Sequence, residues 1–290
     1  MKLGRISAAI GALVLLASAG QARETVLDKA LAAFKGADYA TVVSTASQIA
    51  SDAPDYAKAQ YLIGEAQLLL AKPEDAERAF KAVLAVHAES QPGRIGLGRA
   101  LAAQNKLEDA EGELRKAVAA DAKDAQAHRA LGDVLVRREN LKEAKGELVD
   151  AYKLAPKDPW VARSYVELLV RLQDTKEATR VAKALAKARP EHPMGAFLEG
   201  VVLERENEVD DAIKAYEAAL KIDDTFLDAH KNLAILCHTM SATYSIKERV
   251  DKSLAHYERY FALGGKDPEL ESAYRSMKAF LGPENNKSKK

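Results

Sequence analysis

Residues 91–124 read QPGRIGLGRALAAQNKLEDAEGELRKAVAADAKD, and residues 125–158 read AQAHRALGDVLVRRENLKEAKGELVDAYKLAPKD. Placed one above the other, the two stretches align like residue on like residue: Gly98 on Gly132, Ala110 on Ala144 and Leu114 on Leu148. The second stretch therefore repeats the first after 34 residues. Because a period of this length is typical of repeat architectures, repetition has to be settled before domains are counted.

The same spacing runs along most of the chain in four columns. One column is alanine: Ala76, Ala110, Ala144, Ala178 and Ala212. A second is small except at one position: Gly64, Gly98, Gly132, Val166, Gly200 and Ala234. A third is mostly bulky: Phe80, Leu114, Leu148, Ala182 and Tyr216. The fourth is proline: Pro54, Pro156 and Pro190. Four columns in one register establish a repeated structural unit.

Each unit predicts two helices joined by a short turn. Apolar residues recur at helical spacing over 61–70 and again over 76–84, and Pro73 between them suits the first turn of a helix. At the same junction, 140–143 and 174–177 place a cap residue three positions before a glutamate, a capping-box pattern. The glycine and alanine columns indicate a close helix crossing, which leaves no room for a large side chain.

In this pattern the sequence resembles the tetratricopeptide repeat family. With positions counted from the first residue of a unit, the small residue at position 8, alanine at 20, a bulky residue at 24 and proline near 32 carry the resemblance. Repeats start at Ala57, Gln91, Ala125, Pro159, Pro193 and Leu227, a degenerate repeat covers 23–56, and the whole array spans 23–261. The resemblance implies an all-α, right-handed superhelical solenoid of stacked antiparallel helix hairpins, whose first helices line a concave groove. It also implies a general protein-interaction scaffold, because such folds carry no single function.

Two units depart from the pattern. Val166 and Ala182 look like an exchange of volume across one hairpin contact. In the unit from Leu227 the pattern resumes seven residues late, which predicts a hairpin with about one added turn in each helix. A capping helix is expected over 262–282, with the stripe Leu270, Ala273, Tyr274, Met277, Phe280 and Leu281. The polar tail 283–290 is expected to be disordered.

Residues 1–22 have the layout of a secretory signal peptide: Lys2 and Arg5, an apolar stretch over 6–17, then small residues. Cleavage is expected after Ala19 or Ala22. The alternative, an uncleaved membrane anchor, is disfavoured because twelve residues span only about 18 Å of a bilayer core of roughly 30 Å. We therefore expect a periplasmic or secreted protein with no membrane insertion after cleavage.

Composition excludes several classes of protein. The chain has 290 residues, of which 43 are Lys or Arg and 43 are Asp or Glu, so no net positive charge favours nucleic acid. Apolar residues make up 48%, which indicates a globular chain. The one cysteine, Cys237, rules out an internal disulfide framework and a site with several thiolate ligands.

No motif of catalysis or cofactor binding is recognisable, so we expect no enzyme, no catalytic residue and no cofactor. A metal site built from His230, Cys237, His238 and His256 was weighed and disfavoured, because His230 and His238 lie two turns apart on one helix. Surface imidazoles beside a buried thiol are the alternative. We therefore expect no metal.

The groove offers the candidate site. Positions 2, 5, 9, 12 and 13 face the concave side in tetratricopeptide repeats, which gives the partner-binding candidates Arg129, Asp133, Arg137, Trp160, Arg163, Glu167, Arg171, Met194, Phe197 and Arg205. Two successive units carry the same Arg-xxx-acid-xxx-Arg pattern. The alternative is that each acid pairs only with the arginines one turn away. Arginine and aromatic residues are enriched at binding hot spots. The Lys/Asn clamp that some family members use for acidic C-termini is not recognisable.

The favoured function is an exported, non-catalytic scaffold or adaptor of a cell-envelope assembly, which binds a protein or peptide segment, acidic in character, along its groove. The alternatives are a cargo chaperone or the substrate-recognition subunit of an envelope enzyme, with an enzyme in its own right third. Arg137, Arg171 and Arg205 share one repeat position, and stacked helices lie roughly 10 Å apart, so an extended acidic ligand could engage them in turn. Trp160 and Phe197 are expected to hold an apolar side chain beside them.

Overall fold

A computed structural model describes residues 25–239 and 245–280. Within these ranges the only regular elements are α-helices. The predicted signal peptide and the predicted disordered tail lie outside the described residues. No helix among the described residues is long and apolar enough to cross a membrane.

The helices divide into two compact units with the boundary between Pro156 and Lys157. The first unit contains α2 (Val26–Lys35), α3 (Tyr39–Ala46), α4 (Tyr56–Leu69), α5 (Pro73–Val86), α6 (Gln91–Ala103), α7 (Leu107–Ala120), α8 (Ala125–Arg137) and α9 (Leu141–Leu154). The second contains α10 (Pro159–Arg171), α11 (Thr175–Ala188), α12 (Met194–Arg205), α13 (Val209–Ile222), α14 (Leu227–Thr239), α15 (Ile246–Ala262) and α16 (Pro268–Phe280).

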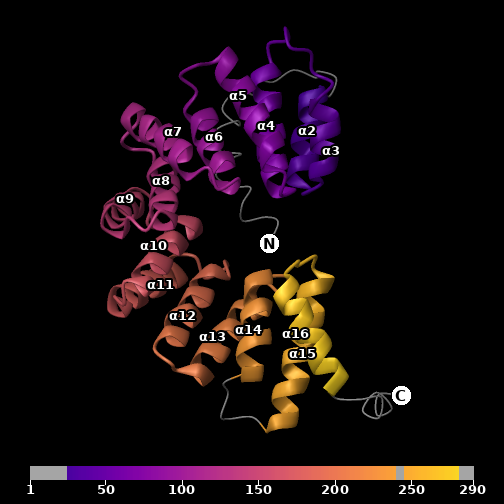
Figure 1. Ribbon diagram of the computed structural model, residues 1–290, viewed down its shortest axis with the longest axis vertical. Helices are drawn as coiled ribbons and strands as arrows, with labels where there is room; N and C mark the ends of the chain where they lie inside the picture. Colours follow the sequence, from indigo (N-terminus) through magenta and orange to yellow (C-terminus); the bar gives the residue numbers. More distant parts are fainter. Residues whose placement is uncertain (1–24, 240–244, 281–290) are drawn as a thin grey trace. The chain divides into compact units, whose positions relative to one another are not determined.

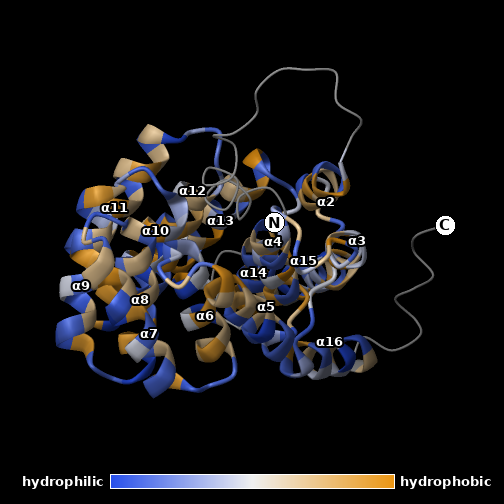
Figure 2. Ribbon diagram, turned by 90° about the horizontal axis from the view of Figure 1, so that it is seen from above, coloured by the Kyte–Doolittle hydropathy of each residue, from blue (hydrophilic) through white to orange (hydrophobic). Residues whose placement is uncertain are grey.

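Within each unit the helices pair into antiparallel hairpins that stack in chain order, as Figure 1 shows. The second helix of one hairpin packs on the first helix of the next, so α5 contacts α6 and α11 contacts α12. First helices also contact one another along the stack, as α4 does α6 and α6 does α8. Figure 2 shows hydrophilic and hydrophobic residues on the same helices, the pattern of helices that bury one stripe. The predicted all-α solenoid of stacked hairpins is confirmed.

The glycine column is explained by direct contact with the bulky column. A Cβ added at Gly64 would lie 2.7 Å from the ring of Phe80, and one at Gly132 would lie 2.6 Å from Leu148. Real Cβ atoms do not approach this closely, so only glycine permits the two helices to cross there. Val166 and Ala182, which break both columns, are fully buried. Their burial is consistent with the predicted exchange of volume.

Every hairpin from α2 to α13 turns at a residue with left-handed backbone. These residues are spaced by 34: Ala37, Ala71, Asn105, Glu139, Gln173 and Asn207, with φ between 56° and 64°. In the α8–α9 turn, the amide of Glu139 donates to the carbonyl of Val136 (3.1 Å) and that of Asn140 to Leu135 (2.9 Å). The paired main-chain bonds form a Schellman motif, which satisfies carbonyls that the helix end leaves open. Because Ala37 follows the same spacing, the degenerate first repeat keeps the register.

Helix capping departs from the sequence prediction. The side chain of Asn140 does not cap α9. Its side-chain amide, Nδ2, instead donates to the carboxylate of Glu143 (2.8 Å). Asp174 does accept from the amide of Glu177, at 3.4 Å. A reciprocal capping box forms instead at α15, between Ser245 and Glu248. The hairpin turn preceding α9 is held by the main-chain bonds above, so it does not depend on the side chain of Asn140.

In the last hairpin, α15 has 17 residues against 14 in α9, so its second helix is about one turn longer, as predicted. α14 is described from Leu227 to Thr239, where the first described range ends, so the added turn in the first helix stays a prediction. The predicted register holds beyond the insertion, because Ser253 is fully buried and donates from Oγ to the carbonyl of Ala234 (2.5 Å). α16 then covers the end of the stack with buried Leu270 and Met277, while Ala273 is exposed.

Candidate partner-binding site

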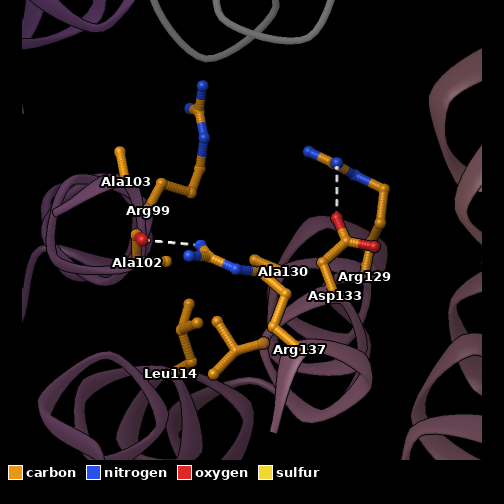
Figure 3. Close-up of a pocket in the computed structure, with 9 residues that line it drawn as sticks. Arg99, Ala102, Ala103, Leu114, Arg129, Ala130, Asp133 and Arg137 are labelled. Atoms are coloured by element: carbon orange, nitrogen blue, oxygen red, sulfur yellow. Dashed lines mark hydrogen bonds and ion pairs between the residues drawn. The ribbon is translucent and has the colours of Figure 1, made fainter. Parts of the chain in front are cut away.

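A pocket of about 240 Å³ lies between α6 and α8 in the first unit. It is lined by Arg99, Ala102, Ala103, Leu114, Arg129, Ala130, Asp133, Val134 and Arg137. Three of these residues carry guanidinium groups and one carries a carboxylate. Figure 3 shows Arg99 and Arg129 with their guanidinium groups on one side of the pocket, while Arg137 reaches across from α8 toward α6.

Small residues at the end of α6 leave this space open. Ala102 and Ala103 occupy positions 12 and 13 of their repeat, where α4 carries Leu68 and Leu69. With only methyl groups at this end of α6, the side chain of Arg137 can reach the α6 backbone. The pocket therefore follows from two alanines that meet the long side chains of the next hairpin.

Arg137 performs a structural task. Its Nη1 donates to the carbonyl of Ala102 (2.5 Å), and its Nη2 donates to Oδ1 of Asn105 (3.1 Å). The carbonyls in the last turn of a helix lack intrahelical partners, and a cation is favoured there by the helix dipole. Arg137 thus ties α8 to the end of α6, and this is a role that sequence reasoning did not predict.

Arg99 and Arg129 face the pocket with donors in reserve. Arg99 donates from Nη1 to Glu65 on α4 (2.7 Å), and the charge of Glu65 raises the pKa of Arg99. Arg129 donates from Nε to Gln126 (3.0 Å) and from Nη1 to Asp133 (3.2 Å). A guanidinium has five N–H donors, so each of the two side chains can also donate to the carboxylate of a ligand. The side chains are 36% exposed at Arg99 and 19% exposed at Arg129.

Position 9 of three successive repeats forms a ladder of alternating charge. Glu65, Arg99 and Asp133 follow one another on α4, α6 and α8, and both acids favour the charged form of Arg99. Neither Arg99 nor Glu65 was among the candidates predicted from the sequence. Both could have been identified by comparing the sign of the charge at position 9 in successive repeats, because it alternates.

On α10 the first arginine of the matching pattern is engaged by side chains of neighbouring helices. Arg163 donates from Nε to Glu167 (2.7 Å) and from Nη1 to Asp228 on α14 (2.6 Å). Its guanidinium also lies over the rings of Trp160, at 5.9 Å, and Phe197, at 5.7 Å. Cation–π contacts of this kind add to the ion pairs. Arg163 is therefore the centre of an internal cluster that joins α10, α12 and α14.

Two predicted groove residues are corrected by the structure. Met194 is fully buried, and Phe197 is 3% exposed and packs against Tyr216 and Phe226, with ring centroids at 5.5 and 5.2 Å. Both are therefore buried in the second unit, where Tyr216 of α13 and Phe226 before α14 cover Phe197. Phe197 therefore cannot hold an apolar side chain of a ligand as expected.

The predicted arginine column divides between the two units. Arg137 belongs to the first unit, whereas Arg171 and Arg205, both exposed, belong to the second. The alternative of local pairing is partly realised, since both acids of the repeated pattern bond to the arginine that precedes them. Trp160 is half-buried beneath Arg163.

No group of three or more histidine, cysteine or acidic residues able to hold a metal ion occurs among the described residues. Cys237 is fully buried, and burial raises the pKa of its thiol to about 11, which disfavours the thiolate that a metal requires. His230 is buried rather than at the surface as expected, and the side chain of His238 lies outside the described residues.

Stacked helix hairpins with a polar pocket on their first helices define a helical-repeat interaction protein. Family models described as tetratricopeptide repeat match residues 71–134 and 166–225. The chain is a tetratricopeptide repeat protein. No curated protein sequence matches the chain significantly.

Solved structures of similar fold support this assignment. Yeast Tom70 aligns with a TM-score of 0.73 at 16% identity, covering 92% of this chain and 59% of that chain. A tetratricopeptide repeat protein from Parabacteroides merdae ATCC 43184 aligns with a TM-score of 0.65 at 11% identity, covering 89% and 99%. The APC/C hetero-tetramer Cut9-Hcn1 aligns with a TM-score of 0.62 at 14% identity, covering 87% of this chain and 48% of that chain. This chain thus spans about half the length of the Cut9-Hcn1 chain that it matches. At these identities the likeness concerns the fold alone.

Proposed function

We propose that this protein is a non-catalytic scaffold that holds an acidic segment of a partner protein at the pocket between α6 and α8. Tetratricopeptide repeats form protein-interaction scaffolds, and the acidic ligand is our addition. The observation that carries it is the convergence of Arg99, Arg129 and Arg137 on about 240 Å³, with Asp133 as the one acid in the lining.

The three arginines of the pocket have different roles. Arg137 is held by the α6 backbone and shapes the pocket wall. Arg99 and Arg129 present planar guanidinium groups, which bind carboxylates in bidentate fashion. The alanines and Leu114 supply an apolar floor against which the methylene groups of a glutamate side chain can pack. A pocket of this volume takes a side chain or a chain end, so the rest of the ligand lies along the first helices.

The test is binding of a fluorescein-labelled hexaglutamate peptide, measured by fluorescence anisotropy in low salt. Arg129→Ala is expected to weaken binding about tenfold, or about 1.4 kcal/mol, because it removes a bidentate contact. Arg78→Ala is the matched control: it removes the same charge from α5, where Arg78 is 72% exposed and pairs with Asp75. The control should change binding less than twofold.

Two outcomes would contradict the proposed pocket. Equal weakening by Arg129→Ala and Arg78→Ala would show that the peptide responds only to net charge. Unchanged binding in Arg129→Ala would place the ligand on another surface. Added salt should weaken wild-type binding, since the contact is between charges.

The proposal extends to export and a role in a cell-envelope assembly. It is supported by the signal-peptide pattern of residues 1–22. A cargo chaperone or the recognition subunit of an envelope enzyme is the alternative. Fractionation with N-terminal sequencing tests export, and co-purification separates the two roles. A fixed stoichiometric partner supports the scaffold, and a heterogeneous set of clients supports the chaperone.

A further inference from the structure

Three hairpins share a polar bond between position 4 of the first helix and position 23 of the second. In α6–α7, Arg94 donates to Glu113 (3.1 Å) and to the carbonyl of Ala88 (2.8 Å). In α8–α9, His128 contacts Glu147 through Nδ1 (2.7 Å) and the carbonyl of Ala122 through Nε2 (3.1 Å). In each case a basic side chain joins the two helices and the loop before them.

The α14–α15 hairpin places two histidines at these positions. Nδ1 of His230 lies 3.0 Å from Nδ1 of His256, and Nε2 of His230 lies 2.9 Å from the carbonyl of Asp224. The carbonyl only accepts, so Nε2 of His230 carries a proton and donates it. A hydrogen bond between the two Nδ1 atoms then exists only while they share one proton. The acid found at position 23 of the other two hairpins is absent here.

We propose that the His230–His256 pair is an acid-sensitive clasp, which holds α15 against α14 near neutral pH and releases it when both imidazoles become protonated. Two positive charges at this separation repel, and both Nδ1 atoms would then be donors with no acceptor between them. Of the three homologous pairs, only this one has a histidine in place of the glutamate at position 23, so the device is specific to the last hairpin.

The surrounding charges do not compensate for a second proton. From α13, Glu217 faces His256 but is bound by Lys252 of α15 at 3.0 Å. From the loop before α14, Asp224 is bound by Arg259 of α15 at 3.2 Å, and Asp223 accepts from Thr225 (2.7 Å). Lys252 and Arg259 add positive charge of their own. Asp223 and Asp224 still attract a proton to His230, but burial outweighs them, since the pKa of His230 is lowered.

The pKa directions agree with this geometry. Burial, followed by the neighbouring His230, lowers the pKa of His256 to about 4, and burial also lowers the pKa of His230. A group with a lowered folded-state pKa binds more protons when unfolded. The stabilisation that the neutral histidine pair contributes to the folded state is therefore fully present above pH 6.5, the ordinary pKa of histidine. It is lost as the pH falls toward 4. For His128, burial opposes protonation, but Glu147 and the Ala122 carbonyl outweigh it and raise the pKa.

Opening the clasp would loosen the end of the second unit. α15 carries the Ser253 bond to Ala234 and the contacts that seat α16 through Tyr257 and Tyr260. Losing the clasp therefore weakens the attachment of the terminal helix. The homologous contact between His128 and Glu147 would respond in the opposite sense, because protonation of His128 strengthens its attraction to the carboxylate.

The test is hydrogen exchange of the full chain at pH 7.0 and 5.0, corrected for the intrinsic pH dependence of exchange. Peptides of α14–α16 are expected to open about tenfold more at pH 5.0, whereas peptides of α8–α9 should not. His256→Glu restores the acid of the other hairpins and should abolish the difference. His256→Gln, which does not titrate at this position, should reduce the difference, leaving only the contribution of the buried His230, and serves if the first variant is poorly folded.

The reciprocal swap, Glu147→His, should import acid sensitivity into α8–α9. Titration of the imidazole Cε1 protons by NMR provides a second readout. A pKa of His256 at or above 6.5 would overturn the proposal. Equal exchange of α14–α16 at the two pH values in the wild-type protein would overturn it as well.

Discussion

Helices α8 and α10 carry the same Arg-xxx-acid-xxx-Arg pattern and use it in different ways. On α8 the pattern opens on a pocket, because α6 ends in Ala102 and Ala103. On α10 the first arginine is instead engaged by two further helices, because Asp228 of α14 pairs with Arg163 and the ring of Phe197 of α12 lies against it. The difference teaches that a groove-facing residue becomes a site or a structural joint according to the side chains of neighbouring hairpins.

The largest expected effect comes from removing the two equivalent arginines at position 5. Arg163→Ala should lower the free energy of unfolding by about 2–3 kcal/mol, because it leaves Asp228, 20% exposed, without its cation and removes a contact with two rings. Arg129→Ala should cost less than about 1 kcal/mol, since its partner Asp133 is 40% exposed. Urea denaturation followed by circular dichroism measures both. If both variants lost the same free energy of unfolding, Arg163 would have no larger structural role than Arg129, which contradicts the comparison.

A smaller effect should follow from closing the pocket of α8 in the manner of α10. Ala103→Phe places a ring at the exposed end of α6, where it would fill the space between Arg99 and Arg137. Binding of hexaglutamate should fall about tenfold, or about 1.4 kcal/mol, with the helical circular dichroism spectrum unchanged. Ala103→Ser is the matched control, because it adds only one atom. If the phenylalanine variant bound the peptide as tightly as the wild type, the peptide would not bind at this pocket.

The smallest effect sharpens the comparison by testing what the two helices have in common. Both end in a left-handed residue, Glu139 after α8 and Gln173 after α10. Asparagine tolerates this backbone better and already stands at Asn105 and Asn207. Glu139→Asn and Gln173→Asn should each stabilise the protein by about 0.5 kcal/mol. Thermal denaturation would show a similar gain for both, and a loss at either would indicate that the replaced side chain makes a stabilising contact.

The fold could be predicted almost completely, because its determinants are local and repeat. Gly64 and Phe80, or Gly132 and Leu148, are apparent as columns before any contact is known. The left-handed turns were missed because four of the six positions are occupied by alanine, glutamate or glutamine, and only two by asparagine. There the conformation is imposed by main-chain bonds, and propensity is overridden.

The candidate site was predicted in part, for an identifiable physical reason. The repeat register gives the face of a helix, so Arg129, Asp133 and Arg137 were found. It does not give the cover supplied by other hairpins, so Phe197 was expected in the groove although Phe226 and Tyr216 bury it. The direct contact between His230 and His256 was not predicted, because the seven inserted residues shift His256 out of its column. Once the register is restored, it falls where Glu113 and Glu147 stand.

The recurring left-handed turn has a consequence for how this protein can change. Its bonds join main-chain atoms only, and they fix the length of the joint while leaving nearly every side chain there exchangeable. A 34-residue segment that begins and ends at such turns carries both halves of its joints with it. Duplication or loss of one whole segment therefore rebuilds the same junction at each end, whereas loss of a single residue within a turn destroys it. The chain is in this sense assembled from interchangeable cassettes, and an array with one hairpin more or fewer is its most accessible neighbour in evolution.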